Sequence, residues 1–145
     1  MTTDMQDSIE RETLIAASLD RVWELVTEPG FWVAPTGAQA VTGETTVARN
    51  EKYGDFPVRV EKLDPKTYAA YRWAPRGEQE LRDGTTTLIE FTLTPEGDGT
   101  RLRVVESGFT ALEGSEELRR KALADNTGGW LEVMEAFKKR AEGAA

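Results

Sequence analysis

Residues 124–137 read ADNTGGWLEVMEAF, and this stretch decides the fold. Apolar side chains recur in it at the three- and four-residue spacing of an α-helix, which places them on one face. The apolar stripe consists of Trp130, Val133, Met134, Phe137 and Ala141. We predict one long helix, from about Ser115 to Ala141, that buries this stripe against another layer of the protein.

The two ends of the predicted helix carry charges that suit its dipole. Ser115 is a good N-cap residue, and Glu116 and Glu117 place negative charge in the first turn. Residues 138–140 are all basic and lie near the other end, where positive charge is favourable. The capping pattern therefore supports the same helix as the apolar stripe.

Two adjacent glycines lie near the middle of this helix. Gly128 and Gly129 each cost a helix about 1 kcal/mol relative to alanine, so their presence needs a reason. We expect them to face the layer beneath the helix. They either allow the backbone to approach that layer closely or leave volume unfilled at the entrance of a cavity.

Most of the chain before this helix has the two-residue period of β-strands. Each segment places apolar side chains on one face, which is typical of antiparallel strands with one buried side. Residues 95–100, PEGDGT, form a hairpin turn, because Asp-Gly suits positive φ angles. The predicted strands lie within SIERETLIAA (8–17), FPVRVEKLD (56–64), TYAAYRWA (67–74), TTTLIEFTLTP (85–95) and TRLRVVESGF (100–109).

A short helix interrupts this pattern after the first strand. Residues 18–30, SLDRVWELVTEPG, begin with a plausible N-cap and carry Leu19, Val22, Trp23 and Val26 at helical spacing. FWVAP (31–35) adds one further turn, with Trp32 either packing that turn onto the sheet or forming a lid. A sheet with one apolar face needs a cover, and only the long C-terminal helix is large enough.

These elements together predict an α+β helix-grip fold in a single domain spanning residues 1–145. A curved antiparallel sheet wraps around the long C-terminal helix, and two short helices follow the first strand. The sequence has no internal repeat, no low-complexity tract and no linker that would divide it.

The composition restricts the kinds of catalytic and metal site that this protein can contain. Because the chain has no cysteine and no histidine, disulfides, thiolate nucleophiles, histidine bases and metal sites built from either residue are excluded. An enzyme would have to work with Asp, Glu, Tyr, Lys, Arg or hydroxyl groups alone. We expect a protein with no metal, no cofactor and no catalytic residue. The net charge of −8 argues against nucleic acid, and the basic residues 119–121 and 138–140 fit solvated helix faces. No apolar stretch approaches the ~20 residues of a membrane span, and no signal peptide is evident, so a cytoplasmic location is expected.

Glu106 is the most informative single residue. By strand alternation it shares a face with Leu102 and Val104, so its carboxyl group should point inward. A buried carboxylate must be paired or protonated. The sequence offers the Tyr71 hydroxyl or Arg72 as partners, and it leaves open a role for Glu106 in anchoring a ligand or in acid–base chemistry.

A ligand site is predicted on the inner faces of the sheet and helix, where apolar walls would surround a few polar groups. Each candidate residue for this site is also compatible with an ordinary core. The candidate ligand-binding residues are Val58, Val60, Tyr71, Arg72, Trp73, Ile89, Phe91, Leu102, Val104, Glu106, Gly129, Trp130, Met134 and Phe137.

Four segments, in this order, resemble the START-like (SRPBCC) superfamily. They are LDRVWELVTEPGFWVAP (19–35), VEKLDPKTYAAYRW (60–73), GTRLRVVESGF (99–109) and NTGGWLEVMEAF (126–137), and the resemblance extends from about Ser8 to Glu142. Within this superfamily they resemble the activator of heat-shock-protein-90 ATPase homologue-like branch. The resemblance implies a sheet wrapped around a C-terminal helix with a hydrophobic cavity between them.

The resemblance leaves three functions open, because one fold hosts many activities. The first is non-catalytic binding of a small hydrophobic or amphipathic ligand in the cavity. The second is a co-chaperone-like domain that binds a protein partner through its surface. The third is a polyketide cyclase or dehydratase that uses Glu106 with Tyr71. We expect the first, and we expect no nucleic-acid partner and no insertion into a membrane.

Overall fold

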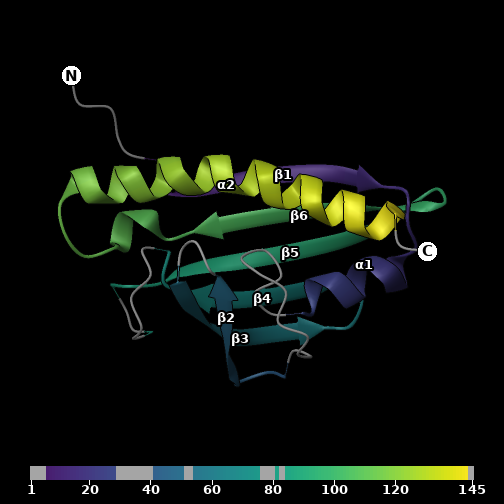
Figure 1. Ribbon diagram of the computed structural model, residues 1–145, viewed down its shortest axis with the longest axis horizontal. Helices are drawn as coiled ribbons and strands as arrows, with labels where there is room; N and C mark the ends of the chain where they lie inside the picture. The colour runs from purple at the N-terminus through teal and green to yellow at the C-terminus, as the bar shows by residue number, and fades with distance from the viewer. Residues whose placement is uncertain (1–5, 29–40, 51–53, 76–80, 82–83, 144–145) are drawn as a thin grey trace.

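The computed structural model describes residues 6–28, 41–50, 54–75, 81 and 84–143. It shows one antiparallel sheet with a long C-terminal helix lying across it (Figure 1). The strands are β1 (Ser8–Ile15), β2 (Thr45–Asn50), β3 (Gly54–Asp64), β4 (Tyr68–Trp73), β5 (Thr87–Glu96) and β6 (Gly99–Ser107). The helices are α1 (Leu19–Val26), the 3-10 helix η1 (Phe109–Ala111) and α2 (Glu116–Gly143).

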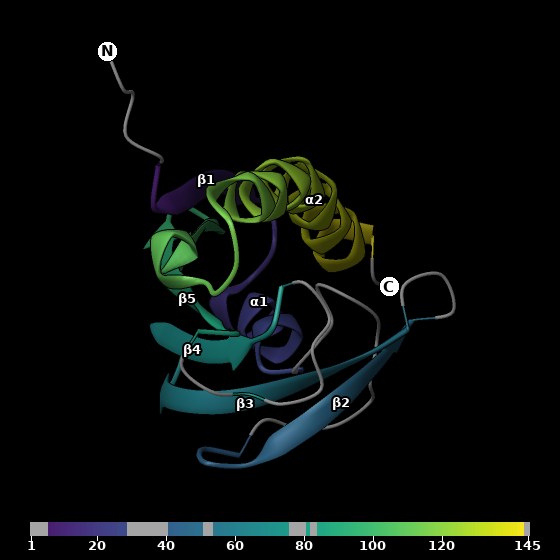
Figure 2. The same cartoon turned by 90° about the vertical axis from the view of Figure 1, so that its left-hand side faces the viewer.

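The six-stranded sheet has the order β1-β6-β5-β4-β3-β2, and every neighbouring pair is antiparallel. The sheet curves around α1 and α2, as the end-on view shows (Figure 2). This is the helix-grip α+β arrangement that the sequence predicts. The first strand β1 pairs with the last strand β6, so the consecutive strands β1 and β2 lie at opposite edges of the sheet.

The short helix α1 forms where the sequence predicts it. The Ser18 hydroxyl accepts a hydrogen bond from the Arg21 amide at 3.2 Å, which caps the helix. The side chains of Val22, Leu25 and Val26 are buried beneath it. The further turn predicted at residues 31–35, including Trp32, lies outside the described residues.

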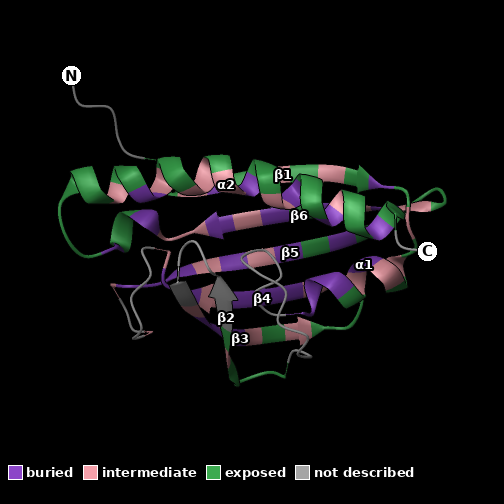
Figure 3. Cartoon of the chain, in the orientation of Figure 1, coloured by how far each residue is buried: buried purple, intermediate pink, exposed green. Residues whose placement is uncertain are grey.

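The long helix α2 begins at Glu116, directly after the predicted cap, and ends at Gly143, slightly beyond the predicted Ala141. The Ser115 hydroxyl accepts a hydrogen bond from the Leu118 amide at 3.2 Å, so the predicted cap is confirmed. Buried residues recur along the side of α2 that faces the sheet (Figure 3). They are Ala122, Trp130, Met134, Phe137 and Ala141, which include most of the predicted stripe.

The interior between sheet and helix is well packed around Phe91. Its ring makes edge-to-face contacts with Tyr71, Trp130 and Phe137, with centroid distances of 6.1, 5.9 and 5.7 Å. Such pairs add to the stabilisation from apolar burial. The inner face of the sheet is thus a continuous core through most of its length.

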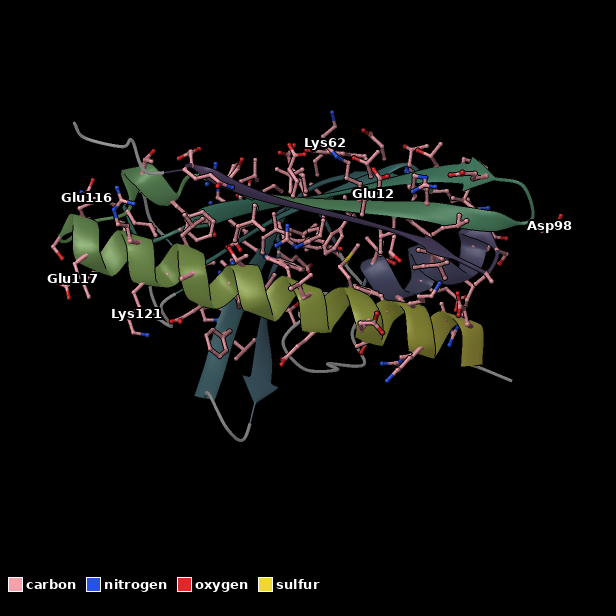
Figure 4. The ribbon with its side chains drawn as sticks, turned by 90° about the horizontal axis from the view of Figure 1, so that it is seen from above. Glu12, Lys62, Asp98, Glu116, Glu117 and Lys121 are labelled. Carbon is pink, nitrogen blue, oxygen red and sulfur yellow. The ribbon has the colours of Figure 1, made fainter. Side chains whose placement is uncertain are left out.

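The outer face of the sheet carries charged side chains. Seen from above, Glu12 and Lys62 project from the side of the sheet that α2 does not cover, while Glu116, Glu117 and Lys121 project from the first turns of α2 (Figure 4). Cross-strand pairs such as Arg101 with Glu12, at 2.9 Å, follow the same face. None of the described helices is long and apolar enough to cross a membrane.

The hairpin between β5 and β6 forms at the predicted position but with a different glycine in the turn. Gly97 has the positive φ angle, +60°, whereas Gly99 already belongs to β6. A side chain on Gly99 would approach the Ile15 carbonyl oxygen to 2.5 Å. Gly99 is therefore needed for the close approach of the end of β1, and the prediction of a left-handed Asp-Gly pair is wrong.

Candidate functional site

A single acidic side chain interrupts the apolar inner face of the sheet. Glu106 on β6 lies beside Ile9 of β1 and Ile89 of β5, and Ile89 in turn lies beside Tyr71 of β4. Strand alternation points all four side chains toward the helix layer. Glu106 is completely buried, with 0% of its surface exposed, as the sequence predicts.

Four side chains donate hydrogen bonds to the Glu106 carboxylate. Trp73 Nε1 and the Thr87 hydroxyl reach Oε2, the former at 2.9 Å. Trp130 Nε1 reaches Oε1 at 2.7 Å. Asn126 Nδ2 lies 2.9 Å from Oε1 and 3.1 Å from Oε2. The donors come from β4, β5 and α2, so the carboxylate ties the C-terminal helix to the sheet.

The environment of this carboxylate is polar but uncharged. Burial raises the pKa of Glu106 above its ordinary value of 4.5, while the hydrogen bonds from Thr87, Trp73, Trp130 and Asn126 act in the opposite direction. Both indole N–H groups can only donate toward the carboxyl group. The Thr87 hydroxyl and the carbonyl oxygen of the Asn126 amide are groups that can also accept a hydrogen bond from a protonated carboxyl group.

The two partners predicted for Glu106 from the sequence are wrong. The Tyr71 hydroxyl points inward but donates to the Val26 carbonyl oxygen at 2.5 Å, at the end of α1. Arg72 lies on the opposite face of β4, where its Nε is 3.5 Å from Glu61 Oε1 and its side chain is 36% exposed. Strand alternation is strict here, and no twist brings Arg72 to the inner face.

A small hollow lies directly beside this buried cluster, between β4 and the middle of α2. Its volume is about 60 Å³. Three of the residues that line it, Trp73, Asn126 and Trp130, are among the four donors to Glu106. The full lining comprises Trp73, Asn126, Gly129, Trp130 and Val133.

The two glycines of α2 are explained by open space. A Cβ atom on Gly128 or Gly129 would meet no described atom within 4 Å, so neither allows a close approach to the sheet. Gly128 is exposed to solvent, whereas Gly129 is half-buried and lines the hollow. The prediction of unfilled volume is confirmed for Gly129, and close packing is wrong for both.

The predicted ligand-binding residues divide between the hollow and the core. Trp73, Gly129 and Trp130 line the hollow. Glu106 lies behind that lining, and Arg72 lies on the other side of the sheet. The remaining ones are buried in the core: Val58, Val60, Tyr71, Ile89, Phe91, Leu102, Val104, Met134 and Phe137.

Three residues at the site were missed from the sequence. Asn126 and Val133 lie four residues before and three after Trp130, and this spacing places all three on one face of a helix. The poor helix formers Asn126 and Thr127, followed by two glycines, were a usable signal. Thr87 could have been found from strand alternation with Ile89 and Phe91.

Solved structures with the same fold come from several bacteria. Protein MLL2253 from Mesorhizobium loti superposes with a TM-score of 0.76 at 20% identity, covering 95% of this chain and 98% of that one. The Aha1 dimer from Colwellia psychrerythraea gives 0.72 at 18% identity, with coverage of 94% and 97%. DynU16, from the dynemicin biosynthetic locus, gives 0.72 at 22% identity, with coverage of 94% and 47%.

These similarities show the fold alone. Comparison with curated proteins gave no match. The family model described as "Activator of Hsp90 ATPase homolog 1-like protein" matches residues 16–142, a range that runs from the end of β1 almost to the end of α2. The chain therefore belongs to the activator of Hsp90 ATPase homolog 1-like family, within the START-like superfamily.

Proposed function

We propose that this protein binds a small apolar or amphipathic molecule, without transforming it, at the hollow between β4 and α2. The observation that carries this proposal is the absence of a side chain at Gly129, beside two buried tryptophans. An alanine there would suit the helix better by about 1 kcal/mol. A wall of indole rings with one polar amide, from Asn126, is typical of small-molecule sites.

The size of the hollow restricts what enters it. Its volume of about 60 Å³ is well below the roughly 300–1,000 Å³ of sites that enclose a drug-sized ligand. The hollow therefore receives one end of a ligand, a group of a few non-hydrogen atoms. The rest of such a molecule lies outside it, beyond Gly129 and Val133.

The geometry favours binding over catalysis. Glu106 is shielded from the hollow by Trp73, Asn126 and Trp130, and both of its oxygens already accept hydrogen bonds. The alternative of an enzyme that pairs Glu106 with Tyr71 loses its basis, because the Tyr71 hydroxyl donates to the Val26 carbonyl. Glu106 acts instead as the fixed acceptor that orients both indole rings of the site.

The proposal can be tested by titrating the ¹⁵N-labelled protein with short-chain alcohols, fatty acids, sterols and aromatic polyketides. Indole N–H signals are assigned by replacing Trp73 and Trp130 with phenylalanine one at a time. A ligand should move these two indole signals together with the amide signals of Gly129 and Val133. If every class of compound leaves these signals in place, the proposal is wrong.

Two glycine variants provide a matched pair for the same titration. Gly129→Leu places a side chain in the hollow and should abolish the shifts. Gly128→Leu makes the same change one residue earlier, at an exposed position, and should leave them intact. Equal binding by both variants would mean that the ligand lies elsewhere on the protein.

A further inference from the structure

The Glu106 carboxyl group has no cationic partner among the described residues. All four of its hydrogen-bond partners are uncharged, and no described lysine or arginine forms an ion pair with it. Arg103, three residues earlier on the same strand, points outward, and its Nη2 lies 2.9 Å from Glu10 Oε2. Buried carboxylates in proteins are usually paired with a cation, so this arrangement is unusual.

The donor set nevertheless fits the ionised form. The indole N–H groups of Trp73 and Trp130 and the amide N–H₂ group of Asn126 converge on two oxygens, and these N–H groups can only donate. Hydrogen bonds to a carboxylate are stronger than those between neutral groups. When Glu106 is ionised, the cluster therefore holds the anion by dipoles alone and leaves its field uncompensated on the side of the hollow.

Two of the side chains that line the hollow are polarised by this charge. Trp73 and Trp130 each donate an N–H group to the anion and each line the hollow. A hydrogen bond to an anion polarises its donor, which makes the indole ring richer in electrons. Indole is already the best aromatic partner for a cation, and a desolvated site strengthens the interaction. The overall charge of −8 further attracts cations to the protein.

We infer that the group received by the hollow is a cation, and specifically the ammonium group of an aliphatic amine held between Trp73 and Trp130. This inference rests on the proposed function and names its ligand class. Asn126 completes the site, because its carbonyl oxygen remains available to accept a hydrogen bond from an ammonium group while its N–H₂ group stays on Glu106. A primary ammonium head is small enough for a hollow of about 60 Å³.

The test compares two probes of equal skeleton, n-butylammonium and 1-butanol, against the full chain. Binding is followed through the indole N–H signals of Trp73 and Trp130 and the amide signal of Gly129. We expect n-butylammonium to bind at least about fivefold more tightly than 1-butanol, in the range of a desolvated cation–π contact. Glu106→Gln should reduce this preference to about twofold or less, since polarisation of the indoles by the anion is lost.

The outcomes separate the inference from the proposed function. If 1-butanol binds as tightly as n-butylammonium, the inference of a cationic ligand is wrong, whereas the proposed ligand site is still supported. If neither probe moves the three signals, and the broader panel of compounds also fails, both proposals are wrong. Since the comparison of probes is made on the unchanged protein, it decides the matter even where Glu106→Gln does not fold.

The two glycine variants distinguish binding of n-butylammonium in the hollow from its attraction to the acidic surface of the protein. Gly129→Leu and Gly128→Leu both keep the full surface charge, but only the former fills the hollow. Binding of n-butylammonium should be lost in Gly129→Leu and kept in Gly128→Leu. Retention of binding in Gly129→Leu would place the amine on the surface and overturn the inference.

Discussion

Trp73 and Trp130 donate their indole N–H groups to opposite oxygens of one buried carboxylate. Trp73 lies on β4 and reaches Glu106 Oε2 at 2.9 Å, and Trp130 lies on α2 and reaches Oε1 at 2.7 Å. The two residues are thereby fixed relative to each other although they belong to different layers. The hollow is bounded by side chains whose orientations are set from behind, which preorganises it for binding.

The first prediction concerns the hydrogen-bond cluster itself. In Glu106→Gln one acceptor oxygen becomes an N–H₂ group that faces donors, so at least one buried donor loses its partner. We expect the free energy of unfolding at neutral pH to fall by about 1–3 kcal/mol, measured by urea denaturation. The same change at the exposed Glu135 should stay within about 0.5 kcal/mol. If Glu106→Gln and Glu135→Gln are equally stable, the hydrogen-bond cluster around Glu106 does not stabilise the fold and the prediction is wrong.

The second prediction is a dependence of stability on pH. The folded-state pKa of Glu106 is raised above 4.5, chiefly by burial, so the folded protein binds this proton more tightly than the unfolded chain. The resulting stabilisation is complete below about pH 4.5 and is lost as the pH rises through the folded-state pKa. No described ionisable group contacts Glu106: the facing residues are Ile9 on β1, Ile89 on β5 and its four uncharged donors.

This contribution is isolated by subtracting the stability of Glu106→Gln, which does not titrate at this position. The difference in the free energy of unfolding between the unchanged protein and the variant should decrease as the pH rises above about 4.5. Urea denaturation at a series of pH values measures it. A difference that stays constant or increases over that range would show that the pKa of Glu106 is not raised.

The sequence predicts the long helix and every described strand except β2 (Thr45–Asn50), because the periodicities of these elements are strong. The strand β6 alternates without interruption from Leu102 to Glu106, and this alone places the carboxyl group of Glu106 inside. The stripe on α2 works in the same way for Trp130 and Phe137. Such patterns report which way a side chain points, since direction follows directly from the helix or strand period.

The partners of Glu106 could not be predicted in the same way. The hydrogen-bond partner of a side chain depends on the register of the strands and on the packing of α2 across the sheet. Neither can be deduced from the periodicity of a single segment. Tyr71 is one strand too far from β6 and lies next to the end of α1, which offers it a carbonyl oxygen instead. Asn126 becomes a partner only because the packing of α2 brings it within hydrogen-bond distance of Glu106.

The third prediction concerns the two glycines as helix residues. Alanine at either position meets no described atom within 4 Å, so each variant gains helix propensity without a clash. Gly128→Ala and Gly129→Ala should each raise the free energy of unfolding by up to about 1 kcal/mol. Chemical denaturation measures the gain. Destabilisation by Gly129→Ala alone would mean that the hollow is tighter than the structure shows.

The fourth prediction tests the role of Tyr71 as a structural rather than a reacting group. Its hydroxyl donates to the Val26 carbonyl oxygen and connects β4 to the end of α1, and burial raises its pKa far above the ordinary value of 10.0. Tyr71→Phe should lower the free energy of unfolding by about 1–2 kcal/mol, because the buried carbonyl loses its donor. Ligand-induced shifts at Trp73 and Trp130 should remain, since Tyr71 does not line the hollow.

Tyr68→Phe is the matched control for this change. The Tyr68 hydroxyl donates to Glu90 at a half-buried position on the same strand, where water can replace the lost hydrogen bond. Its cost should therefore be smaller than that of Tyr71→Phe when both are measured by urea denaturation. If Tyr71→Phe instead leaves stability unchanged but abolishes ligand binding, Tyr71 belongs to the binding site, and the division between core and hollow drawn above is wrong.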